Sequence, residues 1–157
     1  MRALNSKHLF LLPVAAVTLA GFKTLQDAPI TQTRLREMLV ELGYEVTDIN
    51  KEVGKEKYSV TFEKSGFNIP VGFEISPSKN YIWLTVNLGP APTEGNAKCL
   101  SLLKQNSKVQ PSFFYITDSG NLLMAQAIDN RGVTNAILRQ RAEFVSDNVG
   151  KTQEFWK

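Results

Sequence analysis

The chain has 157 residues, which is enough for one domain with a sizeable hydrophobic core. Hydrophobic residues make up 43% of it and charged residues 21%, a composition that excludes a disordered chain. The 18 basic and 15 acidic side chains give a net charge of +3, and His8 is the single histidine.

The N-terminal segment has the composition of an export signal. Arg2 and Lys7 make a positive start, and the apolar run that follows them carries no charge. Thr18 and Ala20 are small residues at the positions that a signal peptidase reads. The run is shorter than the roughly 20 apolar residues of a transmembrane helix. We therefore predict a signal peptide over residues 1–20, cleaved near Ala20; the alternative is an uncleaved anchor that holds the same domain at a membrane surface.

Removal of this segment changes the chemistry of what remains. The rest of the chain keeps 16 basic and 15 acidic side chains, a net charge of +1, and no histidine. Without an imidazole base, Ser-His-Asp and Cys-His nucleophile systems are excluded, and too few ligands remain for a zinc site. We expect no catalytic residue, no cofactor and no metal. The protein would be exported, periplasmic or extracellular in a bacterium, without stable membrane insertion after cleavage.

The first element after the signal is an amphipathic helix. It begins at Thr31 or Thr33, either of which can cap it, and ends at Gly43. Its apolar stripe has helical spacing and consists of Leu35, Met38, Leu39 and Leu42. Residues 45–57 are charged and predict a loop or a weak edge strand.

Three strands in succession are predicted over residues 58–63, 68–76 and 81–88, and the short gaps between them favour an antiparallel meander. One face of each of the first two strands is polar. The third strand differs, because Tyr81 and Trp83 point away from the face that carries Ile82 and Leu84. Two large aromatic side chains therefore lie off the expected core.

The second half of the chain adds two strands and two helices. A helix over residues 94–105, capped by Thr93, is expected to bury Ala97, Leu100 and Leu103. Cys99 lies in this helix as a buried small hydrophobe or as a handle for intermolecular pairing. The other elements are strands over residues 112–117 and 121–128, joined by a turn at 118–121, and a helix from Thr134.

The predicted fold is α+β, with the order α-β-β-β-α-β-β-α and three helices on one face of a five-stranded antiparallel sheet. It forms a single domain over residues 31–149, followed by a C-terminal tail over 150–157. The last three strands are apolar on both faces, so the side of the sheet near Trp83 needs a cover. The cover is the chain's own Phe155 and Trp156, a second copy or a partner protein. The candidate partner or dimer face consists of Tyr81, Trp83, Phe113 and Tyr115.

Other motifs carry less chemistry. The GKT sequence at 150–152 is not a phosphate-binding loop, because that motif needs a glycine five residues before Gly150 and the position holds Val145. Glu63 and Glu74 could face each other on paired strands, and Glu37 and Glu41 lie one helical turn apart. Such carboxylate pairs leave open a carboxylate-only hydrolase acting on an extracytoplasmic polymer. A nucleic-acid site would use Arg34, Arg36, Arg139 and Arg141, but the near-neutral charge after cleavage disfavours it, and we expect no nucleic-acid partner.

The sequences LREMLVELGYEV (35–46), IWLTVNL (82–88) and residues 102–145 resemble the type III secretion chaperone-like fold and, within it, the YbjN-like family. In the last stretch the matching positions are Leu102, Leu103, Asn106, Gly120, Leu122 and Thr134. The resemblance implies no catalytic motif. It implies dimers that bind extended segments of partner proteins along their sheets, although the export signal departs from the cytosolic secretion chaperones. We expect a non-enzymatic, exported, homodimeric protein-binding or chaperone-like module.

Overall fold

The computed structural model describes residues 28–92 and 95–157, so the predicted signal peptide and the predicted cap Thr93 lie outside the described residues. Among the described residues no helix combines the length and the apolar character needed to span a bilayer. The elements in chain order are α1 (Gln32–Glu41), β1 (Thr47–Asn50), β2 (Lys57–Lys64), β3 (Phe67–Ile75), β4 (Tyr81–Pro90), α2 (Gly95–Gln105), β5 (Phe113–Ile116), β6 (Asn121–Asp129), α3 (Asn135–Lys151) and α4 (Gln153–Trp156).

The strands form one antiparallel sheet in the order β1-β2-β3-β4-β6-β5. The predicted α+β class and the meander of the first strands are confirmed, with six strands in place of five. The added strand is β1, inside the charged stretch that predicted a loop or a weak edge strand. It has four residues, its Ile49 is exposed, and its pairing with β2 shifts register between Asp48 and Asn50. Such a strand buries too little to leave a hydrophobic pattern.

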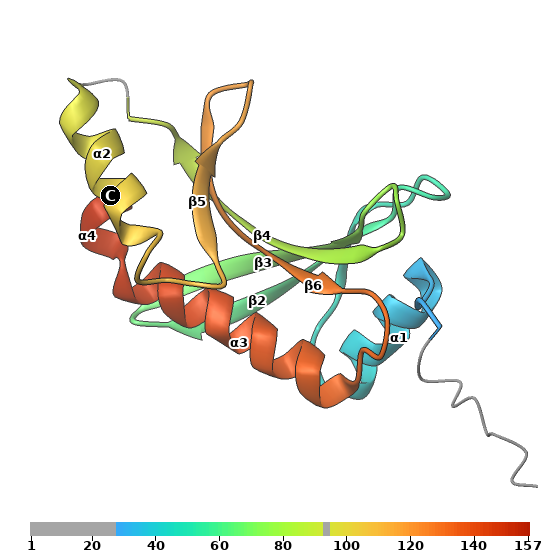
Figure 1. The fold of residues 1–157 in the computed structure, drawn as a ribbon. Coiled ribbons are helices and arrows are strands. Elements are labelled where there is room, and N and C mark those ends of the chain that lie inside the picture. The colour runs from blue at the N-terminus through green and yellow to red at the C-terminus, as the bar shows by residue number, and fades with distance from the viewer. Residues whose placement is uncertain (1–27, 93–94) are drawn as a thin grey trace, which may run out of the picture.

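All the helices lie on one side of the sheet, and α3 runs under β2, β3, β4 and β6 (Figure 1). The buried stripe of α3 repeats at helical spacing through Leu138, Ala142, Val145 and Val149. It packs on the strand side chains that alternate toward it, and the largest fully buried ones include Phe73, Leu84 and Met124. The opposite side of the sheet carries no helix of the described residues (Figure 1).

The ends of the long helices follow from local chemistry. The hydroxyl of Thr31 accepts a hydrogen bond from the Arg34 N–H at 3.2 Å, which confirms the first predicted N-cap. Beyond the other end of α1, Gly43 has a φ of 83°, a conformation that glycine adopts without steric cost. Thr134 caps α3 in the same way as Thr31 caps α1.

The prediction for α2 was wrong in the face that it buries. Leu100 and Leu103 are 54% and 64% exposed and Ala97 is exposed, whereas Leu102 is buried. The reason is that α2 contacts β5 and α4 at the end of the sheet and does not lie across its centre. The three residues of the predicted stripe therefore stay exposed, and Leu102, which lies outside that stripe, is the buried leucine of α2.

The C-terminal residues pack on the helix side of the sheet. The Trp156 indole N–H donates to the Val149 carbonyl at 3.0 Å, and its ring lies 6.0 Å from that of Phe67. Phe67 shares the face of β3 that carries the buried Ile69 and Val71. Trp156 therefore lies on the far side of the sheet from Trp83. The domain limits of 31–149 stay a prediction.

Candidate functional site

The candidate site is the side of the sheet opposite the helices, at the end formed by β4, β6 and β5. We call Tyr81, Trp83, Phe113 and Tyr115 the aromatic face. They occupy alternate positions of their strands, and the residues between them, including Ile82, Leu84 and Phe114, are buried on the helix side. The alternation of the backbone therefore forces these four side chains outward.

Small residues on β6 let the large rings of its two neighbours approach each other. Trp83 is paired with Ala127 and Phe113 with Ala125. The Trp83 and Phe113 ring centroids lie 6.2 Å apart with planes at 79°, an edge-to-face geometry that aromatic pairs favour. The structure thus joins side chains from two strands that are not adjacent in the sheet.

The cluster extends along β5 and ends short of Tyr81. The Phe113 and Tyr115 centroids are 5.9 Å apart, so three of the four predicted residues form a continuous set of rings. Tyr81 is 47% exposed, is paired with Asp129 at the start of β4, and has no ring contact with the other three among the described residues. It lies at the margin of the cluster.

Carboxylates border the aromatic face and are neutralised locally. Glu74 lies directly opposite Trp83, and its carboxylate is 3.5 Å from the Lys57 ammonium. Partial burial, and then the negative charge of Glu74, raise the pKa of the Tyr115 phenol above its ordinary value. Tyr115 therefore remains a neutral hydrogen-bond donor at physiological pH, which suits a surface that binds apolar or polar uncharged groups.

The same side of the sheet is polar over β2 and β3. Outward positions there carry Ser59, Thr61, Glu63, Asn68 and Gly72, as the sequence predicted. The helix-free side therefore has an aromatic end and a hydrogen-bonding end.

A second apolar surface adjoins the aromatic face and was missed by the sequence analysis. It is a groove of about 250 Å³ between α2 and β5, here called the edge groove, lined by Cys99, Leu102, Leu103, Phe114, Tyr115 and Ile116. Ile116 is 48% exposed, and the Leu100 and Leu103 side chains of α2 are also exposed. The apolar run of residues 113–116 was the available signal, but the surface that needed a cover was expected around Trp83 and not beside α2.

Tyr115 lines the edge groove and also contacts Phe113, so the two apolar surfaces are continuous. Cys99 is half-buried at this groove, between the two predicted environments. Its thiol faces the Pro92 carbonyl at 4.0 Å.

The acidic pairs that would serve a hydrolase do not assemble. Glu63 is paired with Asn68 and Glu74 with Lys57, so the predicted juxtaposition of Glu63 and Glu74 across β2 and β3 was wrong. The two strands do pair, but their register places Glu63 opposite Asn68, which lies six residues before Glu74 on β3. No group of three His, Cys, Asp or Glu side chains within the described ranges could hold a metal ion.

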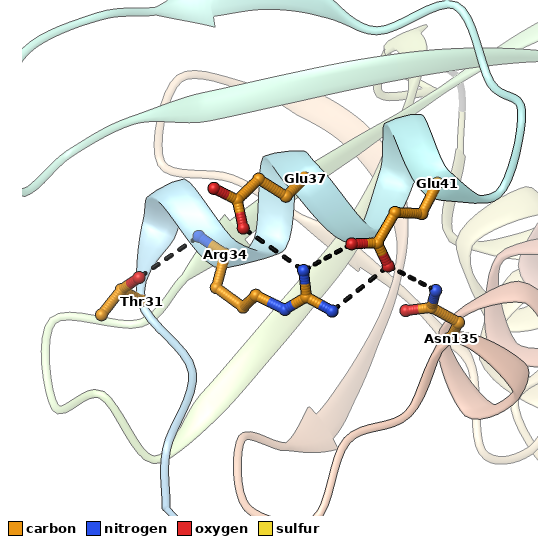
Figure 2. A network of polar contacts seen from close by, with 5 residues as sticks. All are labelled: Thr31, Arg34, Glu37, Glu41 and Asn135. Atoms are coloured by element: carbon orange, nitrogen blue, oxygen red, sulfur yellow. Dashed lines mark hydrogen bonds and ion pairs between the residues drawn. The ribbon is translucent and has the colours of Figure 1, made fainter.

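Glu37 and Glu41 instead bind one arginine (Figure 2). The Arg34 guanidinium lies 3.3 Å from the Glu37 carboxylate and 2.6 Å from that of Glu41. Arg34, and then the Asn135 amide at 2.8 Å, lower the pKa of Glu41 by hydrogen bonding to its charged form. Because Asn135 begins α3, this network links the ends of two helices.

Three of the four arginines considered for nucleic acid bind partners within the chain. Arg36 pairs with Asp48 at 2.9 Å, and Arg139 donates to the Leu42 carbonyl at 3.2 Å. Arg141 lines a separate cleft at the end of β6. The GKT sequence is also structural, because Gly150 lies in α3 where a Cβ atom would come within 2.9 Å of the Ser65 hydroxyl.

Solved structures with a similar fold include the following three. The first is a chain of the heterodimeric ExoU–SpcU complex from the type III secretion system of Pseudomonas aeruginosa, with a TM-score of 0.52 at 16% identity over 73% of this chain and 90% of that one. The second is a chain of the HopA1–SchA chaperone–effector complex, with a TM-score of 0.53 at 10% identity over 82% and 98%. The third is YbjN from E. coli, with a TM-score of 0.52 at 16% identity over 81% and 96%.

The sequence matches no protein-family model and no curated protein. At these identities the likeness shows the fold alone. The chain has the α+β fold that the type III secretion chaperones and YbjN share, which confirms the resemblance drawn from the sequence.

Proposed function

We propose that this chain is a non-enzymatic, exported protein-binding module, of a chaperone-like kind, that acts as a homodimer. The observation that carries the proposal is the aromatic face, where the Phe113 ring contacts those of Trp83 and Tyr115 on the side of the sheet opposite every described helix. Contiguous apolar surface of this kind marks an interaction site in a soluble domain. The shared fold supports the proposal, because one similar structure is a chaperone–effector complex.

The partner that fits is an extended segment of another protein. Rigid aromatic side chains provide large contact areas at small entropic cost, which is why they dominate binding energies. The polar side chains over β2 and β3 continue the same surface and offer hydrogen bonds to the backbone of a chain laid across the sheet. An extended peptide could place apolar side chains over the rings and form hydrogen bonds with the polar side chains of β2 and β3.

The second copy fits at the edge groove. Leu103 is a protruding apolar side chain, and the hollow beside it is lined by Phe114 and Ile116. A two-fold interface brings the same patch of both copies together, so a side chain of one copy meets the hollow of the other. This arrangement leaves Trp83 and Phe113 open for the partner.

The experiment that tests the partner site uses the fluorescence of Trp83. The chain has two tryptophans, so a Trp156→Phe background leaves Trp83 as the sole emitter. We expect its emission to shift on titration with reduced, carboxymethylated ribonuclease A, a protein that remains unfolded and contains no tryptophan. Phe113→Ser should weaken this binding about tenfold, or about 1.4 kcal/mol, because it removes a contacting ring.

The matched control is Thr61→Ser, which changes the polar end of the same side and should leave binding within twofold. Chemical denaturation should show that Phe113→Ser remains folded, since Phe113 is half-buried. An emission that does not change with the unfolded chain, or an affinity unchanged by Phe113→Ser, would contradict the partner site.

A further inference from the structure

The free edge of β5 has backbone groups that another strand could use. β5 is the last strand of the sheet and, within the described ranges 28–92 and 95–157, pairs with β6 alone. The Thr117 N–H donates to the Asn121 carbonyl at 2.9 Å, which identifies Ile116 and Leu122 as a non-hydrogen-bonded pair. Because hydrogen bonding alternates along an antiparallel pair, the N–H and C=O groups of Phe114 and Ile116 point away from β6.

Asn106 occupies the first of these positions. The Phe114 N–H donates to its Oδ1 at 2.7 Å, and its Nδ2 donates to the Phe114 carbonyl at 3.3 Å. The side-chain amide therefore makes the two hydrogen bonds that a neighbouring strand would make. Asn106 is held in place by its own N–H, which donates to the Leu103 carbonyl at 3.2 Å beyond the end of α2.

The start of β5 is closed as well. The Ser112 N–H donates to the Val109 carbonyl at 2.9 Å, so a pairing strand would need Phe114 and Ile116 together. Asn106 thus decides whether the edge can be used. At the opposite end of the sheet, β1 is distorted by its register shift, a feature that hinders edge-to-edge pairing.

We propose that the β5 edge is a latent pairing surface for β5 of a second copy of this chain, and that Asn106 keeps it closed. The occupant is a second copy because two identical edges can pair antiparallel about a two-fold axis. The exposed Leu103 and Ile116 flank this edge and would be buried by that pairing. The inference rests on the backbone geometry of β5, and it holds whether or not the aromatic face binds a partner.

The test follows backbone amide exchange by NMR in Asn106→Leu, which keeps the side-chain size and removes both hydrogen bonds. In the wild type, the Phe114 amide should be protected at every protein concentration and the Ile116 amide should exchange freely. In Asn106→Leu, both amides should become protected as the protein concentration rises a hundredfold, with exchange at least tenfold slower. Rapid exchange of both amides at all concentrations would overturn the proposal.

A second substitution separates strand pairing from nonspecific association. Ile116→Pro removes the outward N–H without touching the ladder to β6, so alone it should fold as the wild type does. Combined with Asn106→Leu, it should abolish the concentration-dependent protection of Phe114, and any aggregation of Asn106→Leu should disappear with it. Association that persists in the double variant would contradict pairing through this edge.

If Asn106→Leu does not fold, Asn106→Ala serves in its place. It removes both hydrogen bonds to Phe114, so protection of Ile116 should again rise with concentration. Its absence would overturn the proposal. The mass of the wild type tests the homodimer separately, and the exchange experiment starts from a concentration at which light scattering shows the wild type to be a monomer.

Discussion

At the scale of single residues, two alanines shape the candidate site as much as the aromatic side chains do. Ala125 and Ala127 on β6 leave room for Trp83 and Phe113 to meet from either side. Aromatic pairs in this geometry contribute about 0.5–1.5 kcal/mol beyond the area they bury. The cluster therefore holds its own shape before any partner arrives, which lowers the entropic cost of binding.

A pH prediction concerns Glu41. Its folded pKa is lowered, so the carboxylate contributes stability at pH values above its ordinary pKa of 4.5. That contribution should be lost as the pH falls through the folded pKa. Glu41→Gln should reduce the free energy of unfolding at pH 7, and the difference from the wild type should vanish in acid. Urea denaturation at several pH values measures it.

The control is Glu45→Gln, another exposed acid near the end of α1 that makes no ion pair among the described residues. It should leave the pH profile of stability unchanged. A Glu41→Gln variant whose stability differs from the wild type by the same amount at pH 7 and in acid would contradict the role given to the Arg34 ion pair.

At the scale of elements, α2 and β5 differ from the rest of the fold. α1 and α3 bury their apolar stripes in the core, whereas α2 sits at the end of the sheet and leaves leucines in solvent. β5 is short and covers only part of the length of β6. The two elements together form a surface that can associate by side-chain packing while its backbone edge is held closed by Asn106.

The element-scale prediction concerns the dimer. Leu103→Asp should convert the proposed homodimer to a monomer, because it places a charge in the proposed apolar two-fold contact. The fold should survive, since Leu103 is 64% exposed. Light scattering gives the mass, and circular dichroism gives the fold.

The neighbouring Leu102→Asp is the matched comparison. Leu102 is 3% exposed, and an unpaired charge buried there should unfold the protein or lower its free energy of unfolding by several kcal/mol. A wild type that is already monomeric at high concentration, or a Leu103→Asp variant that remains dimeric, would refute the proposed dimer contact.

At the scale of the whole molecule, the residues of the core and those of the candidate binding site lie on different sides of the sheet. One side of the sheet is covered by α3 and its neighbours, and none of the described helices lies on the other side (Figure 1). A domain of this kind can vary its outer side without disturbing the core, because strand alternation assigns the two sets of side chains to different sides.

The whole-molecule prediction concerns export. We expect the protein recovered from the periplasm or medium of a bacterial expression host to begin at Gly21, because cleavage after Ala20 follows the small-residue pattern of residues 18–20. Intact mass spectrometry measures the terminus. A variant with Ala20→Arg should retain the uncleaved N-terminus. A wild-type protein found only in the cytoplasm with Met1 in place would contradict the export proposal.

The sequence alone was sufficient for the local features. The hydroxyls of Thr31 and Thr134 indicated where their helices begin, because threonine caps helix N-termini. The two-residue alternation of β4 placed Trp83 and Leu84 on opposite faces of the strand. It also indicated the fold class, because helices and strands differ in the period of their apolar residues.

The features that only the tertiary structure decided depend on which elements meet. Periodicity shows that α2 has an apolar stripe, but the position of α2 at the end of the sheet leaves Leu103 exposed. Register, set by the turn between β2 and β3, separates Glu63 from Glu74. The order of β4, β6 and β5 brings Trp83 to Phe113, and the approach of α2 to β5 brings Asn106 to Phe114. A sequence specifies each of these contacts only through the packing of the whole chain, because their partners lie far apart along it or in different elements.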